Sequence, residues 1–326
     1  MTAGQPDTPP SLLRVDRSAH GMRADAFLAR EFPELSRTRI RQKIQMGESL
    51  LDGRRYATST RLREGQLITV IWRGPPVGAG HLQIPILWED AAFVAVDKPA
   101  GVASHPVGGR QSGTVVQFAR QRFAAEIRAS IDAGDAGFYP TLANRLDVFS
   151  SGIVLIAKTQ EAHAAMQALM LRRLVEKEYL LLVEGRLDAD AGVIDAPIGF
   201  DATSGIRVKM ACRPDGSPSV TEYSVLRRLP AHTFVRAIPR TGRQHQIRVH
   251  FAGLGHPVVG DLLYKDEEMF LRFQRSGGDP EGTLPQRHAL HAAVMRFLHP
   301  LTGRAVSIGS PLPQDFVDML AAAERA

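Results

Sequence analysis

The chain has 326 residues, a hydrophobic fraction of 44%, a charged fraction of 23% and a formal net charge of +6. These values are typical of a soluble globular protein with a sizeable core, and the length predicts two domains. No apolar run is long enough to cross a bilayer, we expect no signal peptide, and the one cysteine, Cys212, excludes an internal disulfide and a thiolate metal cluster. We therefore expect a cytoplasmic protein, and the positive charge favours a polyanionic partner such as nucleic acid.

Residues 1–12 are polar and are expected to form a disordered tail, and residues 13–73 are expected to form a small first domain. Within this domain, "RADAFLAREF" predicts a short helix and "EGQLITVIW" predicts a strand. The segment that follows, residues 74–85, is rich in proline and glycine and therefore predicts a linker.

A helix with a cationic surface is predicted in "LSRTRIRQKIQMG". Ser36 suits the N-cap, Gly47 suits the C-terminal stop, and Ile40 and Ile44 lie four residues apart on an inward face. A surface that carries cations alone repels itself unless an anion neutralises it, which favours phosphate binding over a solvated face. The order helix, glycine, strand and turn resembles the S-four-like RNA-binding domain. The RNA contacts that this resemblance implies are Arg37, Arg39, Arg41 and Lys43.

Residues 86–326 are expected to form a second, larger domain. Strands are predicted at residues 93–96 and 153–157, and in "KEYLLLVEGRL". Helices are predicted in "GTVVQFARQRFAAEIRASI" and "QEAHAAMQALMLRRLV". Because strands outnumber helices and do not alternate regularly with them, the pattern predicts the α+β class rather than a doubly wound sheet.

Two later segments are interpreted from their residue patterns. Residues 245–251, "HQIRVHF", alternate between two faces, with Ile247 and Val249 on one and Arg248 on the other, and they predict a strand. An arginine flanked by apolar residues needs a partner if it is buried. Residues 265–286 are polar and contain glycine, and they predict an insertion loop.

The stretch "NRLDVFSSGIVLIAK" places an acid, Asp147, directly before a buried strand. A single aspartate in a loop is most often a turn residue. Two features favour a functional site instead. Arg145 can point to the same side of an extended segment as Asp147, and "SSG" supplies small residues that let a ligand approach the backbone. The residues alone leave both interpretations open.

This stretch also resembles the signature of the RluA-type pseudouridine synthases. Four further segments resemble the family's other motifs and follow in the family's order: "VAVDKPAGVASHP", "VEKEYLLLVEG", "RTGRQHQIRVHFAGLGHPVVGDLLY" and "RHALHAAVMRFLHPLTG". The resemblance implies a mixed, mainly antiparallel sheet. It implies Asp147 as the catalytic nucleophile, Tyr179 as the aromatic residue against the target uracil, and Arg248 as the partner that keeps Asp147 ionised. The substrate-binding residues that it implies are Arg145, Arg243, His245 and Leu290.

Four positions around Asp147 differ from the family pattern. Asn144 stands where histidine is usual, Val148 and Phe149 replace a charged pair, and Ser150 replaces threonine. Asparagine and histidine can both donate a hydrogen bond, so a structural role at that position can be kept. A phenylalanine this close to the acid is expected to alter the contacts to nucleotides that flank the target.

Pseudouridine formation exchanges a carbon–nitrogen glycosidic bond for a carbon–carbon bond without net redox change, so we expect no cofactor. His245, His250, His288 and His291 suggest a metal site, but their spacing lacks a third-ligand pattern and we expect no metal. Relatives with this N-terminal domain typically modify large-subunit ribosomal RNA, which is the substrate expected here for a monomeric enzyme. Modification of transfer RNA and a non-catalytic role in RNA binding or ribosome assembly are the alternatives.

Overall fold

The computed structural model describes residues 11–32, 35, 37–71, 82–106, 113–133, 138–275 and 287–325. Contacts divide the chain into two compact units, Met1–Gln83 with His105–Pro140 and Ile84–Ser104 with Thr141–Ala326. Residues 105–140, which the sequence assigns to the second domain, group with the first unit in this division. Ser36, expected as a helix N-cap, lies outside the described residues.

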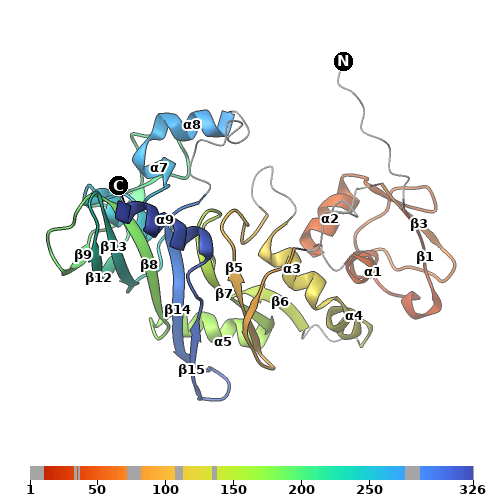
Figure 1. Ribbon diagram of the computed structural model, residues 1–326. Coiled ribbons are helices and arrows are strands. Elements are labelled where there is room, and N and C mark those ends of the chain that lie inside the picture. The colour runs from red at the N-terminus through yellow and green to blue at the C-terminus, as the bar shows by residue number, and fades with distance from the viewer. Residues whose placement is uncertain are drawn as a thin grey trace. The chain divides into compact units, whose positions relative to one another are not determined.

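The first unit combines a three-stranded antiparallel sheet, in the order β1–β3–β2, with short helices (Figure 1). Its strands are β1 (Ser11–Arg14), β2 (Ser49–Leu51) and β3 (Leu67–Val70). Its helices are the 3-10 helix η1 (Arg17–Ala19), α1 (Ala24–Glu31), α2 (Arg37–Gln45), α3 (Val115–Arg122) and α4 (Ala124–Asp132). Strand β1 begins two residues inside the segment expected as a tail.

Helix α2 has the inward face that its sequence predicts. Ile40 is fully buried and Ile44 is 3% exposed. Both pack in one apolar cluster with Phe27 and Leu28 of α1. Gly47 adopts φ +78°, the left-handed conformation that ends a helix without a Cβ clash, and its N–H donates to the carbonyl of Ile44.

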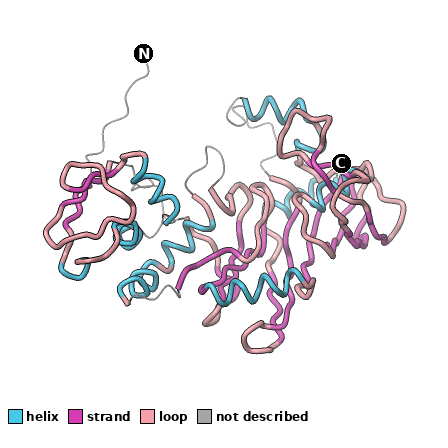
Figure 2. Tube along the Cα trace, turned by 180° about the vertical axis from the view of Figure 1, so that it is seen from behind, coloured by secondary structure: helices cyan, strands magenta, loops and turns pink. Residues whose placement is uncertain are grey.

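The second unit is built on a ten-stranded sheet with the order β4–β5–β7–β14–β8–β13–β12–β9, in which β15 pairs with β14 and β6 with β7. Figure 2 shows these strands as one layer. They are β4 (Ile86–Glu89), β5 (Phe93–Lys98), β6 (Phe138–Leu142, which begins in the first unit), β7 (Ser151–Thr159), β8 (Glu176–Glu184), β9 (Ala191–Asp195), β12 (Val220–Arg228), β13 (His232–Pro239), β14 (Leu290–Leu298) and β15 (Ala305–Gly309).

The remaining elements of this unit lie outside the ten-stranded sheet. Strands β10 (Ile198–Phe200) and β11 (Met210–Cys212) form a separate antiparallel ribbon. The helices are α5 (Gln160–Leu171), α6 (Gln246–Gly253), α7 (Leu262–Lys265), α8 (Glu267–Arg275) and α9 (Gln314–Arg325). The α+β class and the mainly antiparallel sheet agree with the expectation from the sequence.

The parallel pairing of β7 with β14, here called the seam, brings segments that are distant in the sequence together near the centre of the sheet. Strand β7 runs parallel to β14, with Gly152 opposite Ala292. Strand β14 is antiparallel to β8 on its other side, where Ala292 lies opposite Tyr179. Asp147 precedes β7 and Leu290 begins β14, so the seam gathers the loop with the acid, the start of β14 and Tyr179 at one end of the sheet.

The strand expected for "HQIRVHF" is wrong, because residues 246–253 form helix α6. His245 adopts φ +56° and turns the chain into the helix. The polar side chains of α6 are buried together with its apolar ones: Gln246 donates to Oγ1 of Thr221 at 3.0 Å, and Nδ1 of His250 lies 2.9 Å from the same oxygen. The strand prediction assumed that alternating polar and apolar residues face solvent and core in turn. In α6 both kinds of residue are buried, so the alternation carried no information about which side faces solvent.

The insertion loop expected at residues 265–286 is also wrong in its first part. Residues 267–275 form helix α8, capped by Asp266, whose Oδ1 accepts from the N–H of Met269 at 2.9 Å. Residues 276–286 lie outside the described residues. The glycines and prolines that suggested a loop all come after residue 275 in the sequence, so none of them lies within the helix.

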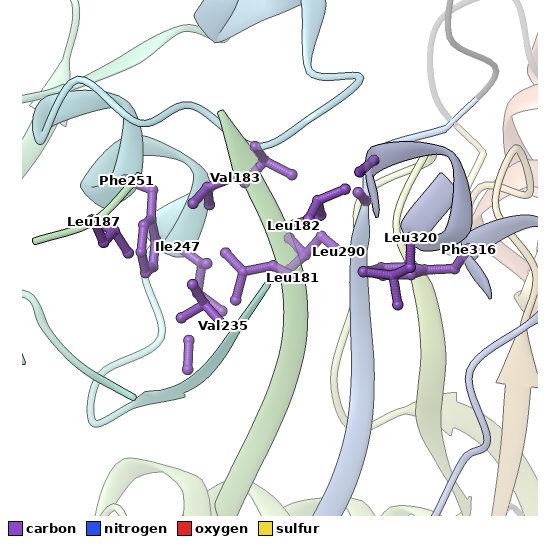
Figure 3. Close-up of a cluster of buried hydrophobic side chains, with 14 of the residues drawn as sticks. Leu181, Leu182, Val183, Leu187, Val235, Ile247, Phe251, Leu290, Phe316 and Leu320 are labelled. Atoms are coloured by element: carbon purple, nitrogen blue, oxygen red, sulfur yellow. The ribbon is translucent and has the colours of Figure 1, made fainter. Parts of the chain in front are cut away.

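One apolar cluster fixes α6 against the sheet (Figure 3). Figure 3 shows Leu181 and Leu290 between side chains of α6 on one side and of α9 on the other. Ile247 and Phe251 anchor α6 in this cluster, and each such burial stabilises the fold by about 1.5–3 kcal/mol. Within the described part of the chain, no helix is long and apolar enough to span a membrane.

Candidate active site

Residues 143–150 form the loop that carries Asp147, here called the Asp147 loop. Asn144 fixes its first part to strand β7. The Oδ1 atom of Asn144 accepts from the N–H of Leu155 at 2.7 Å, and its Nδ2 donates to the carbonyl of Ile153 at 3.2 Å. Asparagine therefore has a structural role at the position where the family usually has histidine.

Backbone groups on both sides of Asp147 are also held. The N–H of Leu146 donates to Oγ of Ser104 at 3.1 Å, and the same hydroxyl donates to the carbonyl of Leu146 at 2.8 Å. The carbonyl of Val148 accepts from the N–H of Gly101 at 2.8 Å. The chain is thus fixed one residue before and one residue after Asp147, which limits where its carboxylate can point.

Lys98, at the end of β5, is a fully buried amine beside this loop. Its Nζ donates to the carbonyls of Pro99, Val102 and Val148 at 2.9, 2.8 and 3.1 Å. Burial lowers the pKa of Lys98 to about 7, although the negative charge of Asp147 acts in the opposite direction. Lys98 therefore ties the turn after β5 to the Asp147 loop.

Arg248 is the centre of a buried ion cluster. Its Nη1 donates to Oδ2 of Asp147 at 2.7 Å, while its Nε and Nη2 donate to the two oxygens of Asp261 at 2.5 and 2.7 Å. The Arg248 side chain is 4% exposed and that of Asp261 is 0% exposed, whereas that of Asp147 keeps 31%. The ring of Tyr264 covers the guanidinium, with its centroid 4.9 Å from Cζ. Only the Asp147 end of this cluster can meet a ligand.

The cluster keeps Asp147 ionised. Burial alone would raise the pKa of Asp147, but the charge and hydrogen bond of Arg248 lower it to about 2. Asp261 is ionised too, because Arg248 holds the pKa of that carboxyl below its usual range against the effect of burial. Two carboxylates share one guanidinium, which leaves a net negative charge at the exposed end. Asp147 is therefore suited to act as a nucleophile and not as an acid.

Two histidines beside the cluster are neutral. Burial lowers the pKa of His245 to about 4 and that of His288 to about 3, and Arg248 adds to both effects. The Oη atom of Tyr264 accepts from the N–H of Met210 at 3.1 Å and lies 2.8 Å from Nδ1 of His245. Burial raises the pKa of Tyr264, so its proton is satisfied by donation to Nδ1. In this tautomer, assigned from the hydrogen bonds, the protonated Nε2 of His245 faces Oδ1 of Asp147 at 3.8 Å.

The structure places the other expected substrate contacts in different surroundings. Tyr179 is half-buried on β8, and burial together with the charge of Asp147 raises its pKa, so its phenol is neutral. Leu290 is buried at the start of β14. Arg145 and Arg243 are exposed. The Nε of Arg243 donates to the carbonyl of Pro218 at 3.3 Å, and the described residues offer Arg145 no hydrogen bond or ion pair.

The expected RNA contacts on α2, within the first unit, have a partner that the helix sequence does not show. Arg37 and Arg41 donate to the carboxylate of Asp25 on α1 at 3.1 and 2.7 Å, and Arg23 donates to it at 3.0 Å. Asp25 is fully buried; burial would raise its pKa, but the three arginines hold that pKa well below its usual range. The protein itself supplies one anion to this cationic surface, which still carries excess positive charge.

The other two expected RNA contacts differ from this pair. Lys43 is mostly buried and donates to Glu48 at 2.6 Å. Arg39 is exposed. The cationic surface of α2 is therefore made mainly by the arginines.

Three residues of the site were not singled out from the sequence: Asp261, Tyr264 and Lys98. Asp261 lies in "VVGDLLY", an acid among apolar residues, and such an acid needs a cation if it is buried. The same reasoning, applied in the sequence analysis to an arginine flanked by apolar residues, drew attention to Arg248. Tyr264 and Lys98 carry no comparable signal, because a tyrosine or a lysine near a turn is ordinarily exposed.

Two of the histidines considered as metal ligands are held by other side chains. His250 bonds to Thr221, and Nδ1 of His291 lies 2.9 Å from Oγ of Ser151. Among the residues with described positions, no group of three or more His, Cys, Asp or Glu side chains is arranged to hold a metal ion.

Residues 92–253 match the family model described as RNA pseudouridylate synthase. The chain is 37% identical over 317 residues to the ribosomal large subunit pseudouridine synthase D of Xanthomonas campestris, a match that covers 94% of this chain and 91% of that protein. The chain belongs to the RluA-type RNA pseudouridine synthases. It is also 34% identical to the protein of the same name from Xylella fastidiosa, over 94% of this chain and 91% of that one.

The fold of this pseudouridine synthase is shared with solved relatives. Human RNA pseudouridylate synthase domain containing 1 is 25% identical, with a TM-score of 0.52 over 76% of this chain and 97% of that one. Family membership makes the protein an isomerase. It confirms the resemblance found in the sequence motifs, and the matched range includes Asp147, Tyr179 and Arg248.

Proposed function

We propose that this pseudouridine synthase isomerises specific uridines of large-subunit ribosomal RNA, with Asp147 as the nucleophile. The names of the Xanthomonas and Xylella relatives support this choice of RNA. The observation that carries the chemistry is the 2.7 Å hydrogen bond from Arg248 to Oδ2 of Asp147. It keeps the carboxylate ionised and occupies one of its two oxygens, which leaves Oδ1 for attack.

The reaction breaks the bond between N1 of uracil and C1′ of ribose and forms a bond between C5 and C1′. The carboxylate of Asp147 attacks either C1′, so that uracil leaves as an anion, or C6 of the base. Both routes need an ionised oxygen. Both end when the bond to Asp147 breaks and frees its carboxylate, the C5 hydrogen is lost as a proton and N1 gains a proton. The target must leave the RNA stack, and Tyr179 and Leu290 are proposed to pack on the extruded base.

The other expected contacts complete the proposal. Arg145, Arg243 and His245 bind the substrate near Asp147. Residues 13–73 bind RNA through α2, and residues 86–326 carry the catalysis. The enzyme acts as a monomer in the cytoplasm and, because the isomerisation involves no net redox change, without a cofactor. The RNA contacts assigned to α2 are Arg37, Arg39, Arg41 and Lys43.

Mapping pseudouridines tests the proposal. Carbodiimide-based sequencing is applied to total RNA from wild-type, deletion and Asp147→Asn cells, with Asp215→Asn as a control that changes an exposed aspartate. We expect at least one large-subunit position to disappear in the deletion and in Asp147→Asn, and to persist in Asp215→Asn. Loss of a transfer RNA position instead would identify the alternative substrate. If no pseudouridine disappears in the deletion cells, the protein does not act as a pseudouridine synthase in the cell. If a pseudouridine that is lost in the deletion cells persists in the Asp147→Asn cells, Asp147 is not the nucleophile.

A further inference from the structure

Lys177, at the second position of β8, has no counter-ion. The chain contains six lysines, and the other five each donate to a partner within the protein. Four of these pair with carboxylates and the fifth donates to backbone carbonyls; they are Lys43, Lys158, Lys209 and Lys265, and Lys98. The described residues offer Nζ of Lys177 no hydrogen bond and no ion pair. The contacts of the fold therefore do not explain a lysine at this position.

The surroundings of Lys177 remove part of its hydration. Its side chain is half-buried, and this burial lowers the pKa of the amine, while the described residues supply no charge that raises it. Nζ is still reached by solvent, because it is not one of the fully buried polar atoms that lack a partner. A partly desolvated cation without a counter-ion costs free energy, and such groups are typical of functional sites. Lys177 is thus suited to receive an anion.

Lys177 lies on the same face of β8 as Tyr179. Successive side chains of a strand point to opposite faces, so residues two apart share a face and lie about 7 Å from each other. Burial and the charge of Asp147 both raise the pKa of Tyr179, which places this ring near the carboxylate. The acids that flank Lys177 in the sequence, Glu176 and Glu178, lie on the other face, where each forms an ion pair with an arginine. The cation therefore shares its face with the active site and not with these acids.

The turn that leads into α6 lies against Lys177. Nζ is 4.0 Å from the point that a Cβ on Gly242 would occupy. Gly242 is exposed, and its N–H meets no acceptor among the residues that the structure describes. The exposed Arg243 follows, and the turn ends at His245, whose Nε2 lies 3.8 Å from Oδ1 of Asp147. An ammonium, a backbone N–H and a guanidinium therefore gather beside the active site.

We propose that Lys177, together with the turn at Gly242 and Arg243, binds a backbone phosphate of the substrate RNA directly beside the target uridine. The proposal rests on the proposed function. A spacing of about 7 Å from Tyr179 is comparable to the distance between a base and a phosphate of the same nucleotide. Extruding a base costs free energy of unstacking, and a phosphate contact beside that base offsets part of the cost and fixes the register of the strand. The RNA then supplies the anion that Lys177 lacks in the free protein.

Binding of the full-length Lys177→Gln variant tests the contact. The probe is an RNA fragment centred on the uridine that the mapping experiment identifies. We expect the Kd to rise about tenfold, because a charge-assisted hydrogen bond is lost. The slope of log K against log salt should become shallower by about 0.7, the value for one phosphate contact of a single strand. An unchanged Kd and an unchanged slope would overturn the proposal.

The variant Lys265→Gln is the matched control. It removes the same charge, but Lys265 is 52% exposed and already paired with Glu184, which lies at the opposite end of β8, roughly 23 Å along the strand from Lys177. Exposed ion pairs of this kind contribute little. Lys265→Gln is therefore expected to keep the wild-type Kd and salt slope. An equal loss in the control would show that net charge, and not a contact by Lys177, sets the affinity.

Neutral linkages in the RNA locate the phosphate. A methylphosphonate replaces one phosphate at a time, from two nucleotides before the target to two nucleotides after it, and each RNA is bound to the wild type and to Lys177→Gln. One linkage next to the target should weaken binding to the wild type but not to Lys177→Gln, because both changes remove the same contact. If every linkage weakens both proteins equally, Lys177 binds no phosphate beside the target and the proposal is wrong.

Urea denaturation separates RNA binding from a role in the fold. Because Lys177 has no partner to lose, Lys177→Gln should keep the wild-type midpoint or exceed it. A midpoint that falls, with no linkage singled out by the methylphosphonate series, would assign Lys177 to the fold and overturn the contact.

Release of tritium from RNA labelled at C5 of uridine distinguishes this inference from the proposed function. If the wild type releases none, the proposed function fails. If the wild type releases tritium and Lys177→Gln binds RNA as tightly as the wild type does, only the present inference fails.

Discussion

Asp261 holds Arg248 through two hydrogen bonds, from Nε at 2.5 Å and from Nη2 at 2.7 Å. Because Nε and Nη2 both donate to the same carboxylate, the guanidinium plane cannot rotate, and the remaining nitrogen, Nη1, points in a fixed direction. That nitrogen, Nη1, bonds to Asp147. Asp261 is a positioning residue: it is fully buried, and it acts on the proposed nucleophile through Arg248.

The variant Asp261→Asn is expected to slow the reaction by about 10²-fold, because a misplaced nucleophile loses the benefit of orientation. The loss should be the same from about pH 5 to pH 8, since Asp147, with a pKa of about 2, stays ionised throughout. The measurement is the single-turnover rate of tritium release from C5-labelled RNA at saturating enzyme.

A control and a stability measurement accompany this prediction. The variant Asp215→Asn breaks an exposed ion pair with Arg213 and should leave the rate unchanged. Asp261→Asn should also lower the free energy of unfolding by about 3–5 kcal/mol, because a buried guanidinium loses a charged partner. A rate that recovers as pH rises would show that Asp261 controls the ionisation of Asp147 and not its position.

Lys98 should make the stability of the enzyme rise with pH. Its pKa of about 7 in the folded state lies below the value of about 10.4 expected in the unfolded chain. Between these values the unfolded chain binds one more proton than the native state, so the free energy of unfolding rises by up to about 1.4 kcal/mol per pH unit. Below about pH 7 both states carry the proton, and the contribution no longer changes with pH.

Urea denaturation of the wild type and Lys98→Met at about pH 7.5 and pH 9.5 measures this effect. Lys98→Met should be less stable at both pH values, because three carbonyls lose their donor. The informative quantity is the pH slope, which should be shallower in Lys98→Met. Equal slopes would show that Lys98 keeps an ordinary pKa in the native state.

The position of Asp147 and the inward face of α2 could be predicted from the sequence because their signals are local, whereas the roles given to the site residues come from the family resemblance. The acid before a buried apolar run placed Asp147 at the entrance of β7, and β7 is buried along almost its whole length. The four-residue spacing of Ile40 and Ile44 predicted the inward face of α2. In both cases the pattern is set by residues within one turn or one strand, which is where periodicity is informative.

The remaining features depend on contacts between distant residues. Arg248 is 101 residues from Asp147, and its second partner, Asp261, is 13 residues further along. Asp25 reaches Arg37 across 12 residues and between two helices. Helix α6 was mistaken for a strand because a segment buried on all sides gives no exposed edge, and short apolar runs then fit either structure.

Gly152 is required by the close approach of β7 and β14. A Cβ at this position would lie 2.3 Å from the carbonyl oxygen of Ala292, and the residue has φ +110°. The variant Gly152→Ala should therefore lower the free energy of unfolding by about 3 kcal/mol or more, and should lower activity, because the seam carries both the Asp147 loop and Leu290. Gly309→Ala, where a Cβ meets open space, should cost less than about 1 kcal/mol in urea denaturation. Similar costs for the two variants would mean that the seam can open.

Arg41 is predicted to have two separable roles, one in the fold and one in RNA binding. Arg41→Ala removes a 2.7 Å hydrogen bond from the fully buried Asp25, which should destabilise α1 and α2 by about 1–3 kcal/mol and raise their amide hydrogen exchange. It should also make the salt dependence of RNA binding shallower, by about 0.7. In the double variant Asp25→Asn/Arg41→Ala, the buried side chain at position 25 is a neutral amide and needs no cation. Protection of α1 and α2 from hydrogen exchange should therefore be higher than in Arg41→Ala, whereas the affinity for RNA should stay as low as in Arg41→Ala. Recovery of affinity together with protection would show that Arg41 acts only through the fold, and an unchanged salt slope in Arg41→Ala would exclude a phosphate contact by this residue.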